Sequence, residues 1–167
     1  QGWFRGVEAG DVNDDGWVDL ILAQDFNKVP ILLINTGNGF FVNETAARLP
    51  NIAMSSARAQ FGDVDNDGDL DLIFNNSGAT NRFGTGQPRI YLNDGSGFFT
   101  DATATNFPAG NISQQMDILF CDIDLDFDLD IFVGTRATSP NQSRLWKNNG
   151  SGVFTLQAGF PNDSASY

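Results

Sequence analysis

The strongest constraint on this chain is a nine-residue acidic loop that it carries three times, at residues 11–19, 63–71 and 122–130. Each copy places oxygen-bearing side chains at loop positions 1, 3, 5 and 9, and an apolar segment follows at once. Carboxylates this close together repel one another unless a cation lies among them, and hard oxygen ligands at this spacing suit Ca²⁺. The loops therefore predict a metal ion, and their repetition predicts a repeat fold.

A second pattern follows each acidic loop, at residues 31–41, 90–99 and 145–154. Each copy reads as an apolar strand, a turn rich in Asn and Gly, and another apolar segment. Asn and Gly supply the positive φ angles that tight hairpins require. Because a further short apolar segment precedes each acidic loop, one unit reads as four antiparallel strands in a meander.

The unit recurs at a regular distance, since the first Asp of the loop stands at residues 11, 63 and 122. Periods of this size with four strands per unit favour a propeller blade over a solenoid. We therefore expect an all-β fold, a β-propeller-type array of three four-stranded antiparallel blades in a single domain over residues 1–167. The blades are expected at about residues 2–51, 52–107 and 108–160.

Three blades are too few for a closed ring, because known propellers have about four to eight. Two arrangements follow from this. The chain is an excerpt of a longer propeller, or two copies pair as a homodimer that completes a six-bladed ring.

The motifs also resemble those of a known family. Residues 61–63 read Phe-Gly-Asp, residues 63–72 match the pattern D-x-D-x-D-G-x-x-D-L, and residues 93–99 match N-D-G-x-G-x-F. In these features the chain is similar to FG-GAP/VCBS repeats, the blades of integrin-α-type propellers and of many secreted bacterial propellers. The resemblance implies a propeller fold, Ca²⁺ between the first two strands, and extracellular adhesion or ligand binding. Asn13 and Phe127 depart from the pattern, where Asp and Gly are expected.

The spacing assigns ligands to each loop. Side chains at positions 1, 3 and 5 curl round one point, Gly at position 6 permits the sharp turn, and the carbonyl of position 7 and the Asp of position 9 close the site. The expected ligands, with the position 7 residue acting through its backbone carbonyl, are Asp11, Asn13, Asp15, Trp17 and Asp19; Asp63, Asp65, Asp67, Asp69 and Asp71; and Asp122, Asp124, Asp126, Asp128 and Asp130.

The three sites are expected to differ in affinity. The first loop offers three ligand carboxylates, and the second and third offer four each. Phe127 should strain the third loop, because a bulky residue at positive φ costs about 1 kcal/mol or more. The second site is therefore predicted to be the tightest of up to three Ca²⁺ sites. The third either binds with an altered turn or is the weakest. An EF-hand is excluded, because position 12 is apolar in each copy rather than Glu.

Composition limits the function. The net charge of −12 argues against nucleic acid and anionic membrane surfaces as partners, and no apolar run is long enough for membrane insertion. His is absent, which removes the usual general base and zinc ligand. Cys121 is the only cysteine and lies in an apolar run, so we expect a small buried residue rather than a nucleophile.

These features predict a non-catalytic, calcium-binding module that is secreted, periplasmic or displayed on the cell surface. Its expected role is adhesion or the binding of a protein or carbohydrate ligand. Two alternatives stay open: a fragment of a propeller-type polysaccharide-active enzyme, or a purely structural spacer. In a meander the acidic loop and the Gly-rich turn lie at one end of each blade. We expect ligand binding at the other end, on the connectors at residues 75–88 and 134–143, with Arg82 and Phe83 as candidate contacts.

Overall fold

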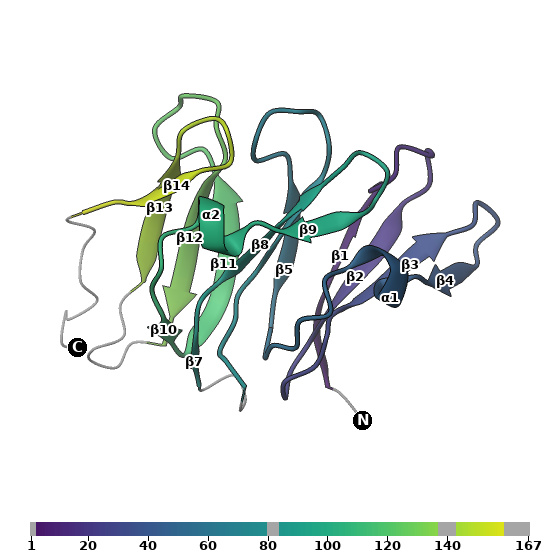
Figure 1. Cartoon of the computed structure of the whole chain (residues 1–167), viewed down its shortest axis with the longest axis horizontal. Coiled ribbons are helices and arrows are strands. Elements are labelled where there is room, and N and C mark those ends of the chain that lie inside the picture. The colour runs from purple at the N-terminus through teal and green to yellow at the C-terminus, as the bar shows by residue number, and fades with distance from the viewer. Residues whose placement is uncertain (1–2, 80–83, 137–142, 159–167) are drawn as a thin grey trace.

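Three four-stranded antiparallel sheets, stacked side by side in chain order, make up the computed structural model of the chain (Figure 1). The structure describes residues 3–79, 84–136 and 143–158. We call the sheets 1, 2 and 3, and each is a meander with the strand order β1-β2-β3-β4, β5-β6-β8-β9 and β11-β12-β13-β14, respectively. This confirms the all-β class and the four-stranded antiparallel unit.

The strand boundaries follow the expected apolar segments closely. Sheet 1 contains β1 (Phe4–Gly10), β2 (Asp19–Gln24), β3 (Ile31–Asn35) and β4 (Phe41–Asn43). Sheet 2 contains β5 (Ala59–Gly62), β6 (Asp71–Phe74), β8 (Arg89–Asn93) and β9 (Phe99–Asp101). Sheet 3 contains β11 (Gln115–Cys121), β12 (Asp130–Thr135), β13 (Arg144–Asn148) and β14 (Phe154–Leu156).

The structure adds elements that the sequence patterns did not indicate. One helical turn follows the last strand of sheets 1 and 2, as α1 (Thr45–Arg48) and α2 (Thr103–Asn106). A two-stranded ribbon pairs β7 (Thr85–Gly86) with β10 (Ile112–Ser113), so the connector at residues 75–88 is not simply a loop. Elements this short contain too few residues to show a hydrophobic period. The candidate contacts Arg82 and Phe83 lie outside the described residues.

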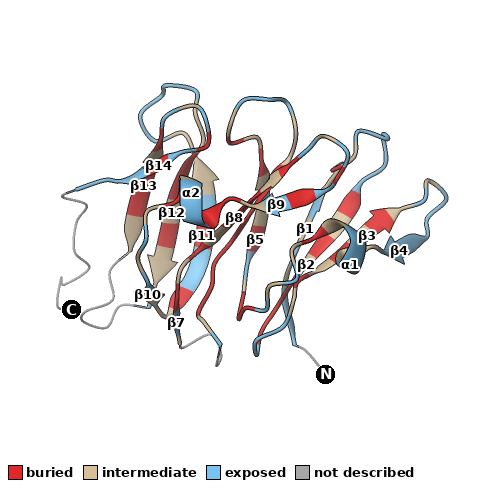
Figure 2. Cartoon of the chain, viewed as in Figure 1, coloured by how far each residue is buried: buried red, intermediate tan, exposed pale blue. Residues whose placement is uncertain are grey.

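The hydrophobic core lies in the two gaps between neighbouring sheets. Strand alternation sends Leu72 and Phe74 of β6 toward sheet 1 and Ile73 toward sheet 3, and all three are fully buried. Aromatic pairs fill both gaps, with ring centroids 5.4 Å apart for Phe74 and Tyr91 in the first. Sheet 2 is therefore apolar on both faces, as Figure 2 shows by its buried strands.

In sheets 2 and 3, an asparagine at the start of the glycine-rich turn joins the sheet to the preceding one. The Asn93 side chain donates from Nδ2 to the Val12 carbonyl oxygen of sheet 1 at 2.8 Å and to the carbonyl oxygen of Leu70 at 3.2 Å. Asn148 repeats this with the carbonyl oxygens of Val64 and Leu129, at 2.7 and 3.2 Å. These buried hydrogen bonds fix how successive sheets stack.

A polar cluster joins sheets 2 and 3 at the other end of the strands. Gln115 is fully buried, and its Nε2 donates to the carbonyl oxygens of Asn76 and Gly86 at 2.6 and 2.8 Å. Its Oε1 accepts the N–H of Asn76, while Asn75 donates from Nδ2 to the backbone oxygen of Gln115. Since buried amides are costly when unpaired, this network gives the two sheets one specific alignment.

The stacking role of the turn asparagine can be tested by comparing Asn93→Ala with Asn35→Ala. Asn93→Ala leaves the buried Val12 carbonyl without a partner, whereas Asn35 donates only within sheet 1, to the Val18 carbonyl oxygen. We expect a loss of about 2–3 kcal/mol in the free energy of unfolding for Asn93→Ala and about 1 kcal/mol for Asn35→Ala. Urea denaturation in dilute solution, where contacts within one chain dominate, measures both. Equal losses would contradict this role.

Candidate metal centre

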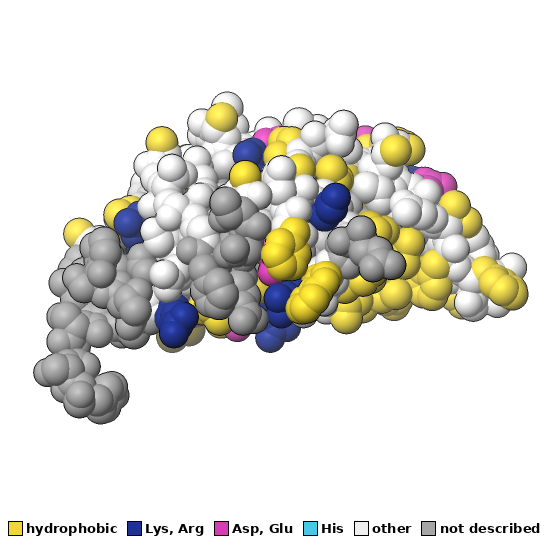
Figure 3. All heavy atoms as spheres, turned by 90° about the horizontal axis from the view of Figure 1, so that it is seen from below, with side chains coloured by type: hydrophobic (Ala, Val, Ile, Leu, Met, Phe, Trp, Pro, Cys, Tyr) yellow, Lys and Arg dark blue, Asp and Glu magenta, His cyan; other side chains and the backbone are white. Residues whose placement is uncertain are grey.

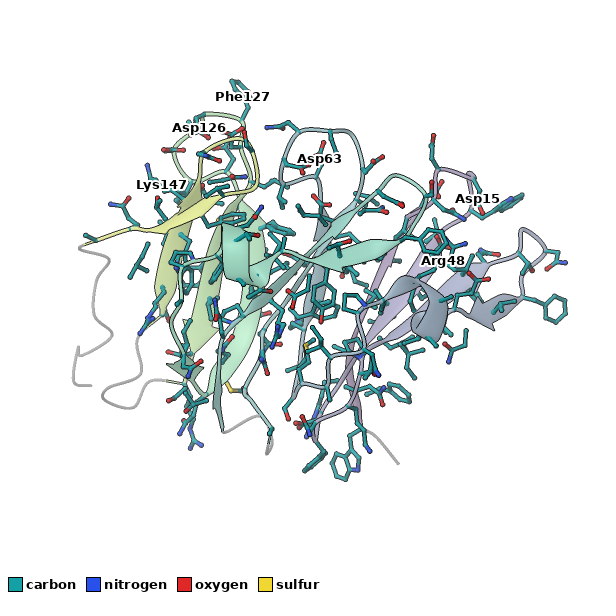
Figure 4. All side chains as sticks on the ribbon, viewed as in Figure 1. Asp15, Arg48, Asp63, Asp126, Phe127 and Lys147 are labelled. Atoms are coloured by element: carbon teal, nitrogen blue, oxygen red, sulfur yellow. The ribbon has the colours of Figure 1, made fainter. Side chains whose placement is uncertain are left out.

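All three acidic loops lie at one end of the molecule. Each connects the first two strands of its sheet, and the glycine-rich turn between the last two strands lies at the same end (Figure 1). We call this the loop end, and the opposite end, with the links between sheets, the connector end. Asp15, Asp63 and Asp126 mark the three loops in Figure 4. This confirms the expected placement of the loops relative to the connectors.

The aspartate at position 9 ties the acidic loop to the glycine turn. Asp71 is fully buried; its Oδ2 accepts the N–H of Val64 at 3.0 Å, and its Oδ1 accepts the N–H of Asn93 at 2.9 Å. Asp19 and Asp130 make the same pair of contacts in sheets 1 and 3, at distances between 2.8 and 3.2 Å. In each sheet, one carboxylate oxygen of the position 9 aspartate therefore binds a backbone N–H of the acidic loop, and the other binds a backbone N–H of the glycine turn.

The aspartate at position 1 shapes the tip of the loop. In the second loop, Asp63 accepts the N–H groups of Asp67 and Gly68 at 3.1 and 3.0 Å. Equivalent contacts to Asp11 and Asp122 form in the other loops. The tight curl needs positive φ at position 6, where Gly68 has a φ of 96°.

Carboxylate oxygens converge in two of the loops. Those of Asp63, Asp65 and Asp71 lie within 4.8 Å of one another, and so do those of Asp122, Asp124 and Asp126. No such acidic triple is found among the described residues of the first loop, where an amide, Asn13, stands at position 3. The sequence-predicted residues are thus brought together most fully in the second and third loops.

Position 3 of the acidic loop holds an unpaired buried oxygen in two of the three copies. Oδ1 of Asn13 and Oδ1 of Asp65 are buried, yet neither has a hydrogen-bond partner. A buried oxygen left unpaired costs about 1–3 kcal/mol, so such atoms are uncommon unless a water or an ion completes them. Hard oxygen donors of this kind, clustered with carboxylates, fit Ca²⁺. Asn13, Asp65 and their neighbours are therefore the residues that would hold it.

Burial and mutual repulsion destabilise the charged carboxylates of the second loop. Burial raises the pKa of Asp71 to about 7 against two backbone hydrogen bonds that lower it, and the charges of Asp65 and Asp67 add to the rise. Burial also raises the pKa of Asp65, with further contributions from Asp67 and Asp63. A divalent cation bound among these carboxylates would lower the pKa of both Asp71 and Asp65, because it favours the ionised form.

The third loop differs from the other two. Lys147 on β13, labelled in Figure 4, lies at this loop. It forms an ion pair with Asp124, and its hydrogen bond lowers the pKa of that carboxyl. Phe127 occupies position 6 with a φ of 74° and is 90% exposed. The lysine already neutralises part of the cluster, and the phenylalanine strains the turn.

The remaining predicted ligands take up other contacts. Asp67 and Asp126 accept the N–H of Asp69 and Asp128, respectively, and Asp15 accepts the N–H of Trp17. The position 7 carbonyls of Trp17, Asp69 and Asp128 stay predictions as ligands. Sequence reasoning missed Lys147, which is brought to the third loop from 23 residues away along the chain. Its only sequence signal was a basic residue just before the turn asparagine, in a strand where the other two copies have Ile34 and Leu92.

A family model described as FG-GAP-like repeat matches residues 11–74 and 78–133. The first stretch contains the first two acidic loops and the second contains the third loop, so the match covers well over half of the chain. A comparison with curated proteins gave no match. Within the described residues, no helix has the length and apolar character needed to cross a membrane.

The strain at position 6 can be tested by reciprocal substitutions. Phe127→Gly removes a side chain from positive φ without losing a buried contact, so we expect the free energy of unfolding to rise by about 1 kcal/mol. Gly68→Ala, at a position where an added Cβ would touch nothing within 4 Å, should lower it by a similar amount. Urea denaturation in the presence of a chelator measures both. A destabilised Phe127→Gly variant would show that the exposed ring has a structural contact in solution.

Asp71 should make the stability of the metal-free chain depend on pH. Its folded pKa of about 7 lies above the ordinary value of 3.8, so the folded state holds the proton more tightly. The free energy of unfolding should therefore fall as pH rises between these values, by at most about 1.4 kcal/mol per pH unit. Denaturation at several pH values with chelator present measures this. The component should vanish in Asp71→Asn; an unchanged slope in that variant would contradict the assignment.

Proposed function

Because the chain belongs to the FG-GAP-like repeat family, we propose that it is a calcium-binding, non-catalytic module of β-propeller type. Its three sheets serve as blades, and Ca²⁺ bound at the loop end stabilises the acidic loops. When bound, the ion supplies positive charge that offsets carboxylate repulsion and completes the unpaired oxygens. The role of the chain itself is to present a rigid binding surface.

The observation that carries this proposal is the pair of unpaired buried oxygens at position 3, in Asn13 and Asp65. Each lies in a loop whose other oxygens already curl inward through backbone hydrogen bonds. A cation bound in the loop would give both oxygens a partner. The second site, with Asp63, Asp65 and Asp71 clustered, should bind most tightly, and the third most weakly because Lys147 competes for Asp124.

The ligand surface is proposed at the connector end. There Trp3 and Phe26 are 61% and 44% exposed, and their rings lie edge to face with centroids 5.9 Å apart. Arg5 stacks on the Trp3 ring and forms an ion pair with the buried Asp25. The ion pair fixes the position of Arg5 against Trp3. Viewed from below, this end shows hydrophobic side chains interspersed with Lys and Arg (Figure 3). Exposed aromatic rings beside polar groups suit a carbohydrate or a protein ligand.

A non-catalytic role is supported by the chemistry of the side chains. The chain has no His, and burial raises the pKa of the Cys121 thiol, which makes the thiolate less available. The acidic clusters that could serve as acid and base are those assigned to metal. Weak Ca²⁺ sites of this kind function where calcium is millimolar, so we place the module outside the cell or at its surface.

Thermal melting with Ca²⁺ or with chelator tests the calcium proposal. Binding to the folded state alone stabilises by about 2.7 kcal/mol per site at a hundredfold excess of ligand, so the Tm should rise by several degrees. Reciprocal exchange at position 3 sharpens the test. Asp65→Asn should lower the affinity of the second loop about tenfold, and Asn13→Asp should raise that of the first by a similar factor, as measured by calorimetry.

Asp94→Asn is the matched control, because it removes an exposed carboxylate from the glycine turn of sheet 2, where sheet 3 has Asn149. Calcium affinity should be unchanged in this variant. A Tm that is the same with Ca²⁺ and with chelator would refute the metal sites, and turnover of a polysaccharide would refute the non-catalytic role.

A further inference from the structure

We call the faces of sheets 1 and 3 that are turned away from sheet 2 their outer faces. Each outer face resembles one side of the interface between neighbouring sheets within the chain. We propose that sheet 3 of one copy of the chain packs on sheet 1 of a second copy, head to tail. The partner is thus another molecule of the same chain. The proposal is independent of calcium binding and rests on a residue-by-residue comparison of the three sheets.

The outer face of sheet 1 carries apolar side chains at positions that are buried in the other two sheets. Phe41 is 42% exposed, whereas its equivalents Phe99 and Phe154 are 6% and 2% exposed. Val7 is 57% exposed, against 4% for Ala59 and 2% for Ile118 in the same register. Figure 2 shows β4 exposed along its length, whereas β9 begins with a buried residue. The difference is the preceding sheet, which covers sheets 2 and 3 only.

The outer face of sheet 3 shows the complementary difference. Position 2 of the acidic loop is covered by the following sheet in the first two copies, where Val12 and Val64 are 2% and 0% exposed. In the third copy Ile123 is 53% exposed, and Leu119 on β11 is 45% exposed. An apolar residue is retained at position 2 although no sheet of the described residues covers it.

Each outer face also carries one partner of the hydrogen bond that joins neighbouring sheets within the chain. Within the part of the chain that the structure describes, Asn35 donates from Nδ2 only to Val18, whereas Asn93 also donates across to the preceding loop. Among the described residues no hydrogen bond to the Ile123 carbonyl oxygen is found, whereas the equivalent oxygen of Val64 accepts from Asn148. One face therefore offers the donor and the other the acceptor of the same buried hydrogen bond.

The glycine turns agree with this pairing. A Cβ added at Gly97 would lie 3.2 Å from Val12 Cγ2, and one added at Gly152 would lie 3.3 Å from Asp65 Cβ, because both turns press on the preceding loop. A Cβ at the equivalent Gly39 would meet nothing within 4 Å. Space for another acidic loop is therefore present beside the turn of sheet 1.

Lys147 on the outer face of sheet 3 is a charged residue at a position where sheets 1 and 2 carry Ile34 and Leu92. Its ammonium is already paired with Asp124, so the second copy would meet a neutralised pair. Two head-to-tail contacts related by a twofold axis close a ring of six sheets; without closure the same contact propagates as an open oligomer.

Sedimentation and light scattering across a range of protein concentrations test the proposal. The chain should assemble to at least twice its 18.1 kDa mass. Phe41→Gln alters only the outer face of sheet 1, and Ile123→Gln only that of sheet 3; each should weaken association by at least ~10-fold. Because the two variants keep opposite intact faces, mixing them should restore one contact and give a heterodimer.

Two matched controls exchange exposed apolar residues that lie off these faces. Val42→Thr and Leu156→Asp introduce the residue types found at the equivalent positions of sheet 2, Thr100 and Asp101, and should leave the mass unchanged. A chain that stays monomeric up to its solubility limit would overturn the proposal. So would an Ile123→Gln variant that associates normally, since that outcome means that sheet 1 pairs with itself.

Discussion

A buried carboxylate at the last position of each acidic loop organises the loop end of this protein. One oxygen of Asp71 accepts the N–H of Val64, within its own loop, and the other accepts the N–H of Asn93, in the glycine turn. The two turns of a sheet are thereby locked to each other. Asn93 then reaches from that turn to the Val12 carbonyl of the preceding sheet. One short chain of hydrogen bonds thus passes from loop to turn to the neighbouring sheet, and it is repeated in the next sheet through Asp130 and Asn148.

This arrangement concentrates negative charge in the acidic loops, whose geometry fixes how the sheets stack. Burial raises the pKa of Asp71, and the nearby carboxylates of Asp65 and Asp67 add to the rise, so the loop that fixes the geometry is electrostatically unfavourable without a counterion. The third loop contains a partial remedy of its own in the ion pair between Lys147 and Asp124. A divalent ion would relieve the same repulsion in the other loops, which links the proposed calcium site directly to the stacking of the sheets. At the connector end, by contrast, the alignment of sheets 2 and 3 rests on hydrogen bonds of the neutral amides of Gln115 and Asn75.

Local patterns in the sequence predicted the strands and turns well, because their causes are local. Alternating apolar residues, positive-φ glycines and closely spaced carboxylates all act within about ten residues. The helical turns at residues 45–48 and 103–106 and the ribbon of β7 and β10 were missed, since such short elements have no period to detect. The asparagine of the glycine turn was predicted only as a turn former. Its contact with the preceding sheet joins residues 81 positions apart for Asn93 and Val12, and no local pattern reports such a pair.

The sequence by itself determined the repeat, the four-stranded meander and the crowding of oxygen ligands in three loops, because the spacing of residues along a strand or loop sets these features. Tertiary structure alone decided which oxygens are left unpaired and which lysine reaches the third loop. It also decided that the same phenylalanine position is covered in sheets 2 and 3 but exposed in sheet 1. The physical reason is that burial and pairing depend on what packs against a side chain. The equivalent positions of neighbouring sheets lie more than 50 residues apart along the chain, so no local pattern reports that packing.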